Sequence, residues 1–127
     1  MNILDNEFKD NNEKLYRAII PIDAFWDEEN NRPTSGAFKD NKGLSVDRQG
    51  NRNNIEAVQT LLKSKRQDSK IVSINIQDCK SVPVFPIYKP LNDNVYHSEI
   101  HDSQEKIEIS GSKCKKLSLA VKLEEVI

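Results

Sequence analysis

The sequence predicts an α+β fold, in which one compact domain holds a small mixed or antiparallel sheet and two helices. The chain has 127 residues, a usual length for a single domain. Several short runs alternate apolar and polar residues as strands do, and one run repeats apolar residues at helical spacing. No sequence repeat or linker composition divides the chain. We therefore expect a polar, mobile segment at residues 1–14 and a single domain over residues 15–127.

The first strand is expected over residues 15–22, LYRAIIPI, where apolar and β-branched residues are concentrated. Pro21 lacks the N–H that a strand ladder needs, so pairing should stop there. The stretch that follows, residues 23–36, carries acids, asparagines and a proline. We expect it to form an ordered loop that is anchored by the adjacent aromatics Phe25 and Trp26.

Short elements and then a helix are expected next. Residues 37–39 are predicted to be briefly extended, and LSVD at 44–47 alternates as a short strand does. Asn53 or Asn54 is predicted to cap a helix that runs to about residue 66. The apolar stripe of this helix consists of Ile55, Val58, Leu61 and Leu62.

The second half of the chain predicts two strands and a further helix. KIVSINIQDC at 70–79 alternates most clearly and predicts a strand. Residues 81–94 contain three prolines and are expected to be an extended connector, followed by a strand at 95–100. The tail fits either a strand or a helix. We favour a helix over 113–126, because this stretch has no glycine or proline and Ser112 can cap it.

The composition excludes several classes of partner. The formal net charge is −1, which gives no overall attraction to nucleic acid or to an anionic membrane. No apolar run reaches the roughly 20 residues that a membrane-spanning helix needs. The N-terminus lacks the basic and apolar pattern of an export signal, and Cys79 and Cys114 are far apart in sequence. The sequence therefore predicts a cytoplasmic protein with reduced thiols and no membrane partner.

The best candidate for a binding site is the polar stretch NRPTSGAFKDNKGLSVDR at residues 31–48. Short elements bounded by glycines can present backbone N–H groups to an anion, and lysines and arginines can add charge-assisted bonds to a phosphate. Solvated loops and turn hydrogen bonds explain the same pattern without a ligand. The candidate ligand-binding residues are Arg17, Arg32, Ser35, Lys39, Ser45, Arg48 and His97.

Arg17 is the most unusual of these residues, because it lies inside an apolar strand. A guanidinium is rarely buried without a partner, since desolvating its charge alone is costly. Arg17 is therefore expected either to pair with an internal carboxylate, for which Glu99 is a candidate, or to reach a ligand pocket.

Metal and thiol chemistry receive little support. His97 and His101 would face the same side of one strand about 13 Å apart, which is too far for one metal ion. We therefore expect no metal site. Cys79 and Cys114 each lie beside lysines that can activate a thiol, but an unreactive thiol is the simpler interpretation.

A series of segments follows in order along most of residues 15–123. These segments contain Arg17, RPTSGAF (32–38), SVD (45–47), Pro90, Asn92, Asn94 and His97, and Lys113. The series resembles a family of small bacterial proteins that has an early arginine, an RPSSAAF-type segment, an SVD-type segment, a PxxNPAHA-type segment and a final helix. Thr34 and Gly36 depart from this pattern, as does NVYHSE. The family has no assigned activity, so the resemblance marks these positions as a candidate site without implying a reaction.

A second similarity concerns the order of three residues. ADP-ribosyltransferase-like folds place an arginine or histidine on an early strand, then a serine or threonine, then a glutamate on a late strand. Arg17, Ser45 and Glu99 occur in that order. This resemblance implies an enzyme that holds NAD with the first two residues and orients the attacking group with the glutamate.

Three functional hypotheses remain open from the sequence. The first is a binding or interaction module for an anionic or nucleotide-like ligand or for a protein partner, with no cofactor. The second is the transferase that uses Arg17, Ser45, Glu99 and NAD. The third is a subunit of a larger assembly, encoded in a mobile or defence locus, with Phe25 and Trp26 as interface anchors.

Overall fold

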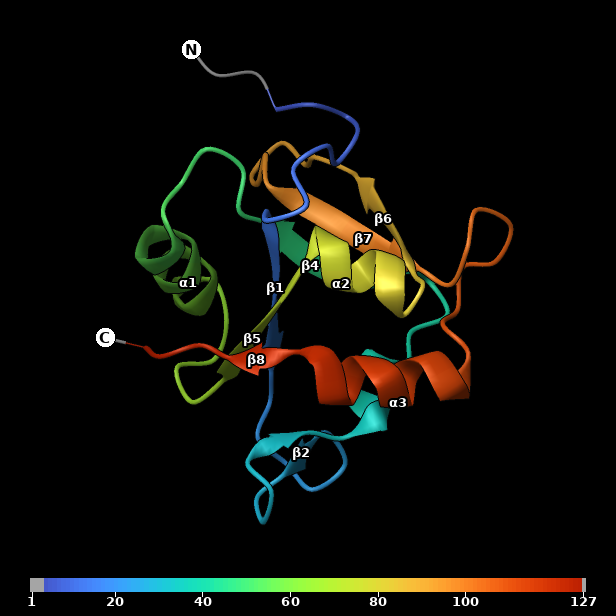
Figure 1. Ribbon diagram of the computed structural model, residues 1–127. Coiled ribbons are helices and arrows are strands. Elements are labelled where there is room, and N and C mark those ends of the chain that lie inside the picture. Colours follow the sequence, from blue (N-terminus) through green and yellow to red (C-terminus); the bar gives the residue numbers. More distant parts are fainter. Residues whose placement is uncertain (1–3, 127) are drawn as a thin grey trace.

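The computed structural model describes residues 4–126 and confirms an α+β fold built on one six-stranded sheet (Figure 1). The strand order is β6-β7-β4-β1-β5-β8, and each neighbouring pair is antiparallel. The strands of this sheet are β1 (Lys14–Ile19), β4 (Leu44–Arg48), β5 (Lys70–Asn75), β6 (Phe85–Tyr88), β7 (His97–His101) and β8 (Lys122–Leu123). The strands β2 (Trp26–Asp27) and β3 (Arg32–Pro33) form a separate hairpin.

Helices cover both faces of the sheet. The first, α1 (Asn54–Lys63), lies on one face, and α2 (Ile76–Ser81) and α3 (Gly111–Ala120) lie on the other, as Figure 1 shows. A short 3-10 helix, η1 (Ser35–Phe38), packs against α3. The predicted helix after Asn53 is confirmed, since the Asn53 side chain accepts a hydrogen bond from the Glu56 N–H at 2.8 Å.

The alternation of side chains on β1 divides the core into two clusters. Leu15 and Ile19 belong to the larger cluster, beneath α2 and α3, which also contains Trp26. Tyr16 points the other way and packs with Val58 of α1 in the smaller cluster. The sheet is thus buried on both faces, although α1 leaves part of its own face uncovered.

The pairing between β1 and β4 is short. These two strands share two partner pairs, Leu15 with Arg48 and Tyr16 with Asp47, whereas β1 pairs with β5 along all six of its residues. Beyond Tyr16 the two strands separate, and the Arg17 side chain occupies the opening. Its guanidinium donates to the carbonyl oxygens of Ala37 and Ser45, at 3.0 and 2.9 Å.

Several sequence predictions of local structure are wrong in their extent. Of residues 37–39 only Lys39 is extended, because Ala37 and Phe38 belong to η1 and are buried beneath α3. The strand predicted over 70–79 ends at Asn75, whose side chain caps α2 by accepting from the Asp78 N–H. This additional helix raises the number of α-helices from the predicted two to three among the described residues.

The proline-rich segment and the tail also differ from expectation. Residues 81–94 contain β6, which lies at the edge of the sheet. An edge strand pairs with a neighbour on one side only, so the sheet tolerates Pro86, which has no backbone N–H to donate. The tail helix begins earlier than predicted and ends at Ala120, after which β8 pairs with β5. Residues 23–36, which were predicted to be an ordered loop, contain the short antiparallel hairpin of β2 and β3.

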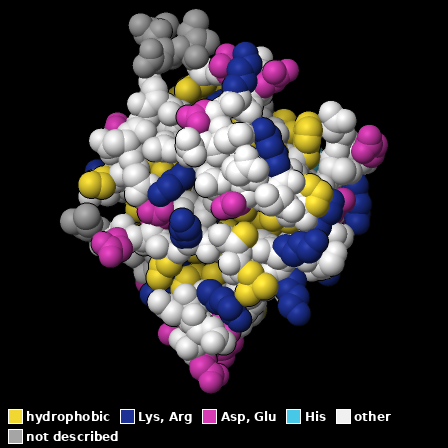
Figure 2. All heavy atoms as spheres, in the orientation of Figure 1, with side chains coloured by type: hydrophobic (Ala, Val, Ile, Leu, Met, Phe, Trp, Pro, Cys, Tyr) yellow, Lys and Arg dark blue, Asp and Glu magenta, His cyan; other side chains and the backbone are white. Residues whose placement is uncertain are grey.

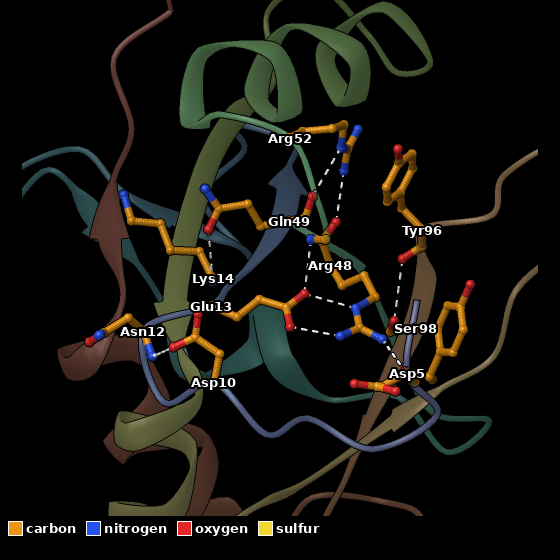
Figure 3. A network of polar contacts seen from close by, with 12 residues as sticks. Asp5, Asp10, Asn12, Glu13, Lys14, Arg48, Gln49, Arg52, Tyr96 and Ser98 are labelled. Atoms are coloured by element: carbon orange, nitrogen blue, oxygen red, sulfur yellow. Dashed lines mark hydrogen bonds and ion pairs between the residues drawn. The ribbon is translucent and has the colours of Figure 1, made fainter. Parts of the chain in front are cut away.

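The segment before β1 is fastened to the sheet by an ion pair, as Figure 3 shows. The Nε and Nη2 groups of Arg48 donate to the two carboxylate oxygens of Glu13 at 2.8 and 2.7 Å. Arg48 also lies against the rings of Phe8 and Tyr88. Residues 5–13 therefore make specific contacts, although a mobile segment was expected at 1–14; residues 1–3 lie outside the described part of the chain.

The face formed by α2 and α3 carries charges of both signs. Figure 2 shows basic and acidic side chains interspersed on this face, with apolar side chains between them. None of the helices within residues 4–126 has the length and apolar character needed to cross a membrane.

Candidate functional site

The sheet face that α1 leaves uncovered carries a groove of about 710 Å³, which we call the α1 groove. Its floor is formed by β1, β4 and β7, and its two walls are the C-terminal half of α1 and the loop between β6 and β7. The polar residues of the lining are Tyr16, Arg17, Ser45, Asp47, Thr60, Ser64, Lys65, Arg66, Ser69, Asp93, Asn94 and His97. The groove is thus rich in hydroxyl and charged groups.

The Arg17 side chain leaves β1 on the face of Leu15 and Ile19, beneath α2 and α3, and it joins the groove lining at the opening between β1 and β4. Burial lowers the pKa of its guanidinium, and the nearby charge of Asp40 partly opposes this effect. An arginine retains its proton at neutral pH even so. Within residues 4–126 no carboxylate oxygen lies within 4 Å of this guanidinium, so its positive charge is solvated by two carbonyl dipoles rather than by a counter-ion.

Ser45 and His97 face each other across β4 and β7. The Oγ atom of Ser45 lies 3.4 Å from Nε2 of His97, and Nδ1 of His97 lies 2.9 Å from the carbonyl oxygen of Lys89. A carbonyl oxygen can accept but not donate, so the proton of a neutral His97 ring is on Nδ1. Nε2 then carries a lone pair that faces the hydroxyl group of Ser45.

A carboxylate completes the floor beside this pair. Asp47 is the direct cross-strand partner of His97, and its side chain lies on the same face of the sheet because directly opposed residues do so. Asp47 is 6% exposed and accepts a hydrogen bond from the Asn94 amide at 2.9 Å. Asn94 belongs to the loop between β6 and β7, so this bond fastens one wall of the groove to its floor.

The α1 wall carries positive charge. Lys65 and Arg66 are both exposed, and both line the groove. Arg66 pairs with Asp68 at 2.8 Å, but both side chains are more than half exposed, and such surface pairs are weak. Lys65 forms no ion pair with any residue between 4 and 126. This wall therefore presents an available ammonium group.

The groove brings together three of the seven residues proposed from the sequence as ligand-binding, namely Arg17, Ser45 and His97. The other four lie elsewhere. Arg32 is exposed on β3, Ser35 begins η1, Lys39 follows η1, and Arg48 is buried in its pair with Glu13.

Glu99 does not pair with Arg17, and this expectation is wrong. Glu99 is the direct partner of Ser45 across β4 and β7, but its carboxylate contacts Nε2 of His101 at 2.8 Å and Nζ of Lys89 at 3.6 Å. It is not among the residues that line the groove. Arg17 instead uses backbone carbonyls, which no sequence pattern could indicate.

The groove residues that were absent from the seven ligand-binding candidates include Asp47, Lys65, Arg66 and Asn94, although the family resemblance had marked Asp47 and Asn94 as part of a candidate site. Asp47 could have been found, because it follows Ser45 at the two-residue spacing that places both on one strand face. Lys65 and Arg66 stand out only as part of a basic run after the helix. Asn94 was marked only by the family resemblance, since its contact with Asp47 depends on how the loop folds back.

The aromatic pair and the two thiols are parts of the protein core. Trp26 is 1% exposed and Phe25 packs against the same cluster, so Trp26 is inaccessible as an interface anchor. Burial raises the pKa of the Cys79 thiol to about 12, and burial also raises that of Cys114. Neither thiol therefore has the thiolate character of a nucleophile at neutral pH.

Among the residues that the structure describes, no group of three or more His, Cys, Asp or Glu side chains is placed to hold a metal ion. Comparisons with protein-family models, with curated proteins and with solved structures find no match to this chain. The α1 groove and its side chains are therefore the basis on which a function can be assigned.

Proposed function

We propose that this protein binds an anionic, nucleotide-like ligand in the α1 groove. The observation that carries the proposal is the guanidinium of Arg17, whose charge faces no carboxylate within ion-pair distance in the described chain. A partly buried charge is stabilised when a charged partner of opposite sign replaces the water it has lost. An anion in the groove supplies that partner.

The size and lining of the groove support a ligand that is partly polar and partly apolar. Its volume of about 710 Å³ lies within the range of small-molecule sites. Ile20, Leu61 and Leu91 add apolar surface to the lining. A phosphate group near Arg17 and Lys65, with a ring against these apolar side chains, would use both kinds of surface.

The resemblance to the small bacterial family agrees with this location. Its segments supply Arg17, Ser45, Asp47, Asn94 and His97, and all five residues line the α1 groove, whereas Pro90, Asn92 and Lys113 do not. We propose that these five positions of the resemblance build the binding groove. Residues 32–38, also part of the resemblance, support the groove indirectly, because the Ala37 carbonyl positions Arg17.

The test is isothermal titration of the protein with ADP and with inorganic pyrophosphate at low and high salt. Binding should weaken as salt rises, because the exposed ammonium of Lys65 is screened. Arg17→Met should weaken binding at least about tenfold, since a hydrogen bond to a charged group contributes roughly 1.5–3 kcal/mol. Lys65→Met should weaken it several-fold.

The matched control is Lys63→Met, which removes an exposed lysine from α1 outside the groove lining. It should leave the affinity unchanged. Thermal unfolding of each variant separates loss of binding from loss of folding. If neither anion binds the wild-type protein, or if Lys63→Met and Lys65→Met weaken binding equally, the groove is not the anion site.

A further inference from the structure

We propose that the α1 groove is also a site of acyl transfer, in which Ser45 is the nucleophile and His97 the general base. The inference rests on the proposed function for its substrate class, a carboxylic ester that carries an anionic group. The catalytic roles of Ser45 and His97 are inferred from the positions of their side chains. The Oγ atom of Ser45 lies 3.4 Å from Nε2 of His97, and Ser45 is exposed within the groove. Nucleophile and base are often this far apart before substrate binds.

The orientation of His97 is fixed from behind. Nδ1–H of the ring donates to the Lys89 carbonyl at 2.9 Å, while the backbone N–H of Lys89 donates to the His97 carbonyl at 3.1 Å. The first bond holds the ring in the tautomer whose Nε2 lone pair faces Ser45, and the second bond fixes the Lys89 backbone beside His97. A third group that orients the base in this way is the recurring feature of nucleophilic hydroxyl sites.

The neighbouring charges suit both stages of the reaction. As His97 takes a proton it becomes a cation, and Asp47 is its direct partner on the facing strand. Arg17 uses two of its five N–H bonds on the Ala37 and Ser45 carbonyls, so further donors remain on the guanidinium. These donors would stabilise the negative charge that develops on the ester oxygen.

The reaction proceeds in two balanced steps. Ser45 Oγ attacks the ester carbon, its proton passes to Nε2 of His97, and His97 returns that proton to the departing alkoxide, which leaves as an alcohol. Water then attacks the acyl-serine ester and transfers one proton to Nε2. Collapse of this intermediate releases the carboxylic acid and returns the proton to Ser45, so no oxidant or cofactor is consumed.

The experiment is reaction of the full chain with a fluorophosphonate probe, followed by intact mass measurement and peptide mapping. Attack by Ser45 forms an oxygen–phosphorus bond and releases fluoride, so one adduct on Ser45 is expected. Ser45→Ala should abolish the adduct. His97→Asn should slow its formation at least about 100-fold, because general base catalysis contributes roughly 10²–10⁴-fold.

His97→Asn is chosen because the asparagine amide can still donate to the Lys89 carbonyl while it removes the basic nitrogen. The matched controls are Ser81→Ala and His101→Asn, a serine and a histidine outside the groove lining; both should label like the wild type. A burst of nitrophenol from p-nitrophenyl acetate, equal to one per chain and lost in Ser45→Ala, provides a second measurement.

The outcomes distinguish this inference from the proposed function. If ADP binds but Ser45 acquires no adduct, or if His97→Asn labels as fast as the wild type, the acyl-transfer proposal is overturned and anion binding stands. If Ser45 is labelled in a His97-dependent manner but neither ADP nor pyrophosphate binds, the roles of Ser45 and His97 in acyl transfer are supported and the proposal of an anionic ligand is overturned.

Discussion

The Nη1 group of Arg17 donates a hydrogen bond to the carbonyl oxygen of Ser45 at 2.9 Å, so a side chain of β1 takes the place of backbone pairing that β4 lacks at this point. The same guanidinium reaches the carbonyl of Ala37, which holds η1 against the sheet. Arg17 is therefore structural and is also available to a ligand, and its two roles can be separated by experiment.

Replacing Arg17 by methionine should lower the free energy of unfolding by about 2 kcal/mol. The two carbonyls that it serves would each lose a donor, and an unpaired carbonyl costs roughly 1–3 kcal/mol, which relief of the guanidinium desolvation partly offsets. Urea unfolding of wild type and variant measures the difference. An unchanged free energy would mean that water replaces the side chain without loss.

The pair formed by Glu13 and Arg48 should respond differently to single and double substitution. Glu13→Gln leaves the buried Arg48 charge without its counter-ion and should cost about 3 kcal/mol of folding stability. Glu13→Leu combined with Arg48→Met removes both charges and should cost less than Glu13→Gln. Denaturant unfolding of the wild type, of Glu13→Leu, of Arg48→Met and of the double variant measures this coupling. A double variant whose loss of unfolding free energy equals the sum of the losses in the two single variants would contradict it.

Glu124 should contribute stability that depends on pH. Burial alone would raise its pKa, but hydrogen bonds from Ser73, Asn54 and Lys14 outweigh burial and lower the pKa below its ordinary value of 4.5. A lowered folded-state pKa gives stability that is present above pH 4.5 and is lost as pH falls through the folded-state value.

Glu124→Gln should therefore destabilise the protein at pH 7, by about 1 kcal/mol, and progressively less as the pH falls below 4. The control is Glu125→Gln, since Glu125 is the exposed neighbour in the chain. Chemical unfolding at a series of pH values measures the effect. Equal pH profiles for the two variants would show that the contacts of Glu124 add nothing.

The two cysteines should resist modification in the folded protein. Both thiols are buried, and burial raises the pKa of each, that of Cys79 to about 12. Incubation with dithionitrobenzoate at pH 8 should release almost no chromophore until denaturant is added, when two equivalents should react. Rapid reaction under native conditions would mean that the surrounding core opens readily.

The transferase alternative predicts that Glu99 acts on NAD. Because the Glu99 carboxylate contacts His101 and Lys89 and is not part of the groove lining, we expect neither turnover nor transfer from labelled NAD. Wild-type and Glu99→Gln proteins should behave alike. Transfer by the wild type that is lost in Glu99→Gln would favour the transferase over the binding module.

Local sequence patterns predicted most elements of the fold. They failed where the local structure depends on contacts that the pattern of apolar residues does not show. The helix after Asn53 was found because its cap and apolar stripe are adjacent in sequence. The change from strand to helix at Asn75 was missed, because the alternation of Ile71, Ser73 and Asn75 continues to Gln77 and hides the cap. Hydrophobic period alone cannot separate a strand end from a short helix start.

The candidate site was predicted in part for the same reason. Arg17, Ser45 and His97 could be singled out because each stands out within its own strand. Arg48 was assigned to a ligand, because its true partner, Glu13, lies 35 residues away in a segment expected to be mobile. The sequence shows that a charge needs a partner, but tertiary packing decides which partner it obtains.

The brief contact between β1 and β4 divides the sheet into two three-stranded halves, β6-β7-β4 and β1-β5-β8. Arg17 belongs to one half, and Ser45, Asp47 and His97 belong to the other. A ligand held by all of these groups would join the halves across their seam. Occupancy of the groove should therefore stiffen the sheet as a whole, and amide exchange along β1 and β4 should slow together when the ligand binds.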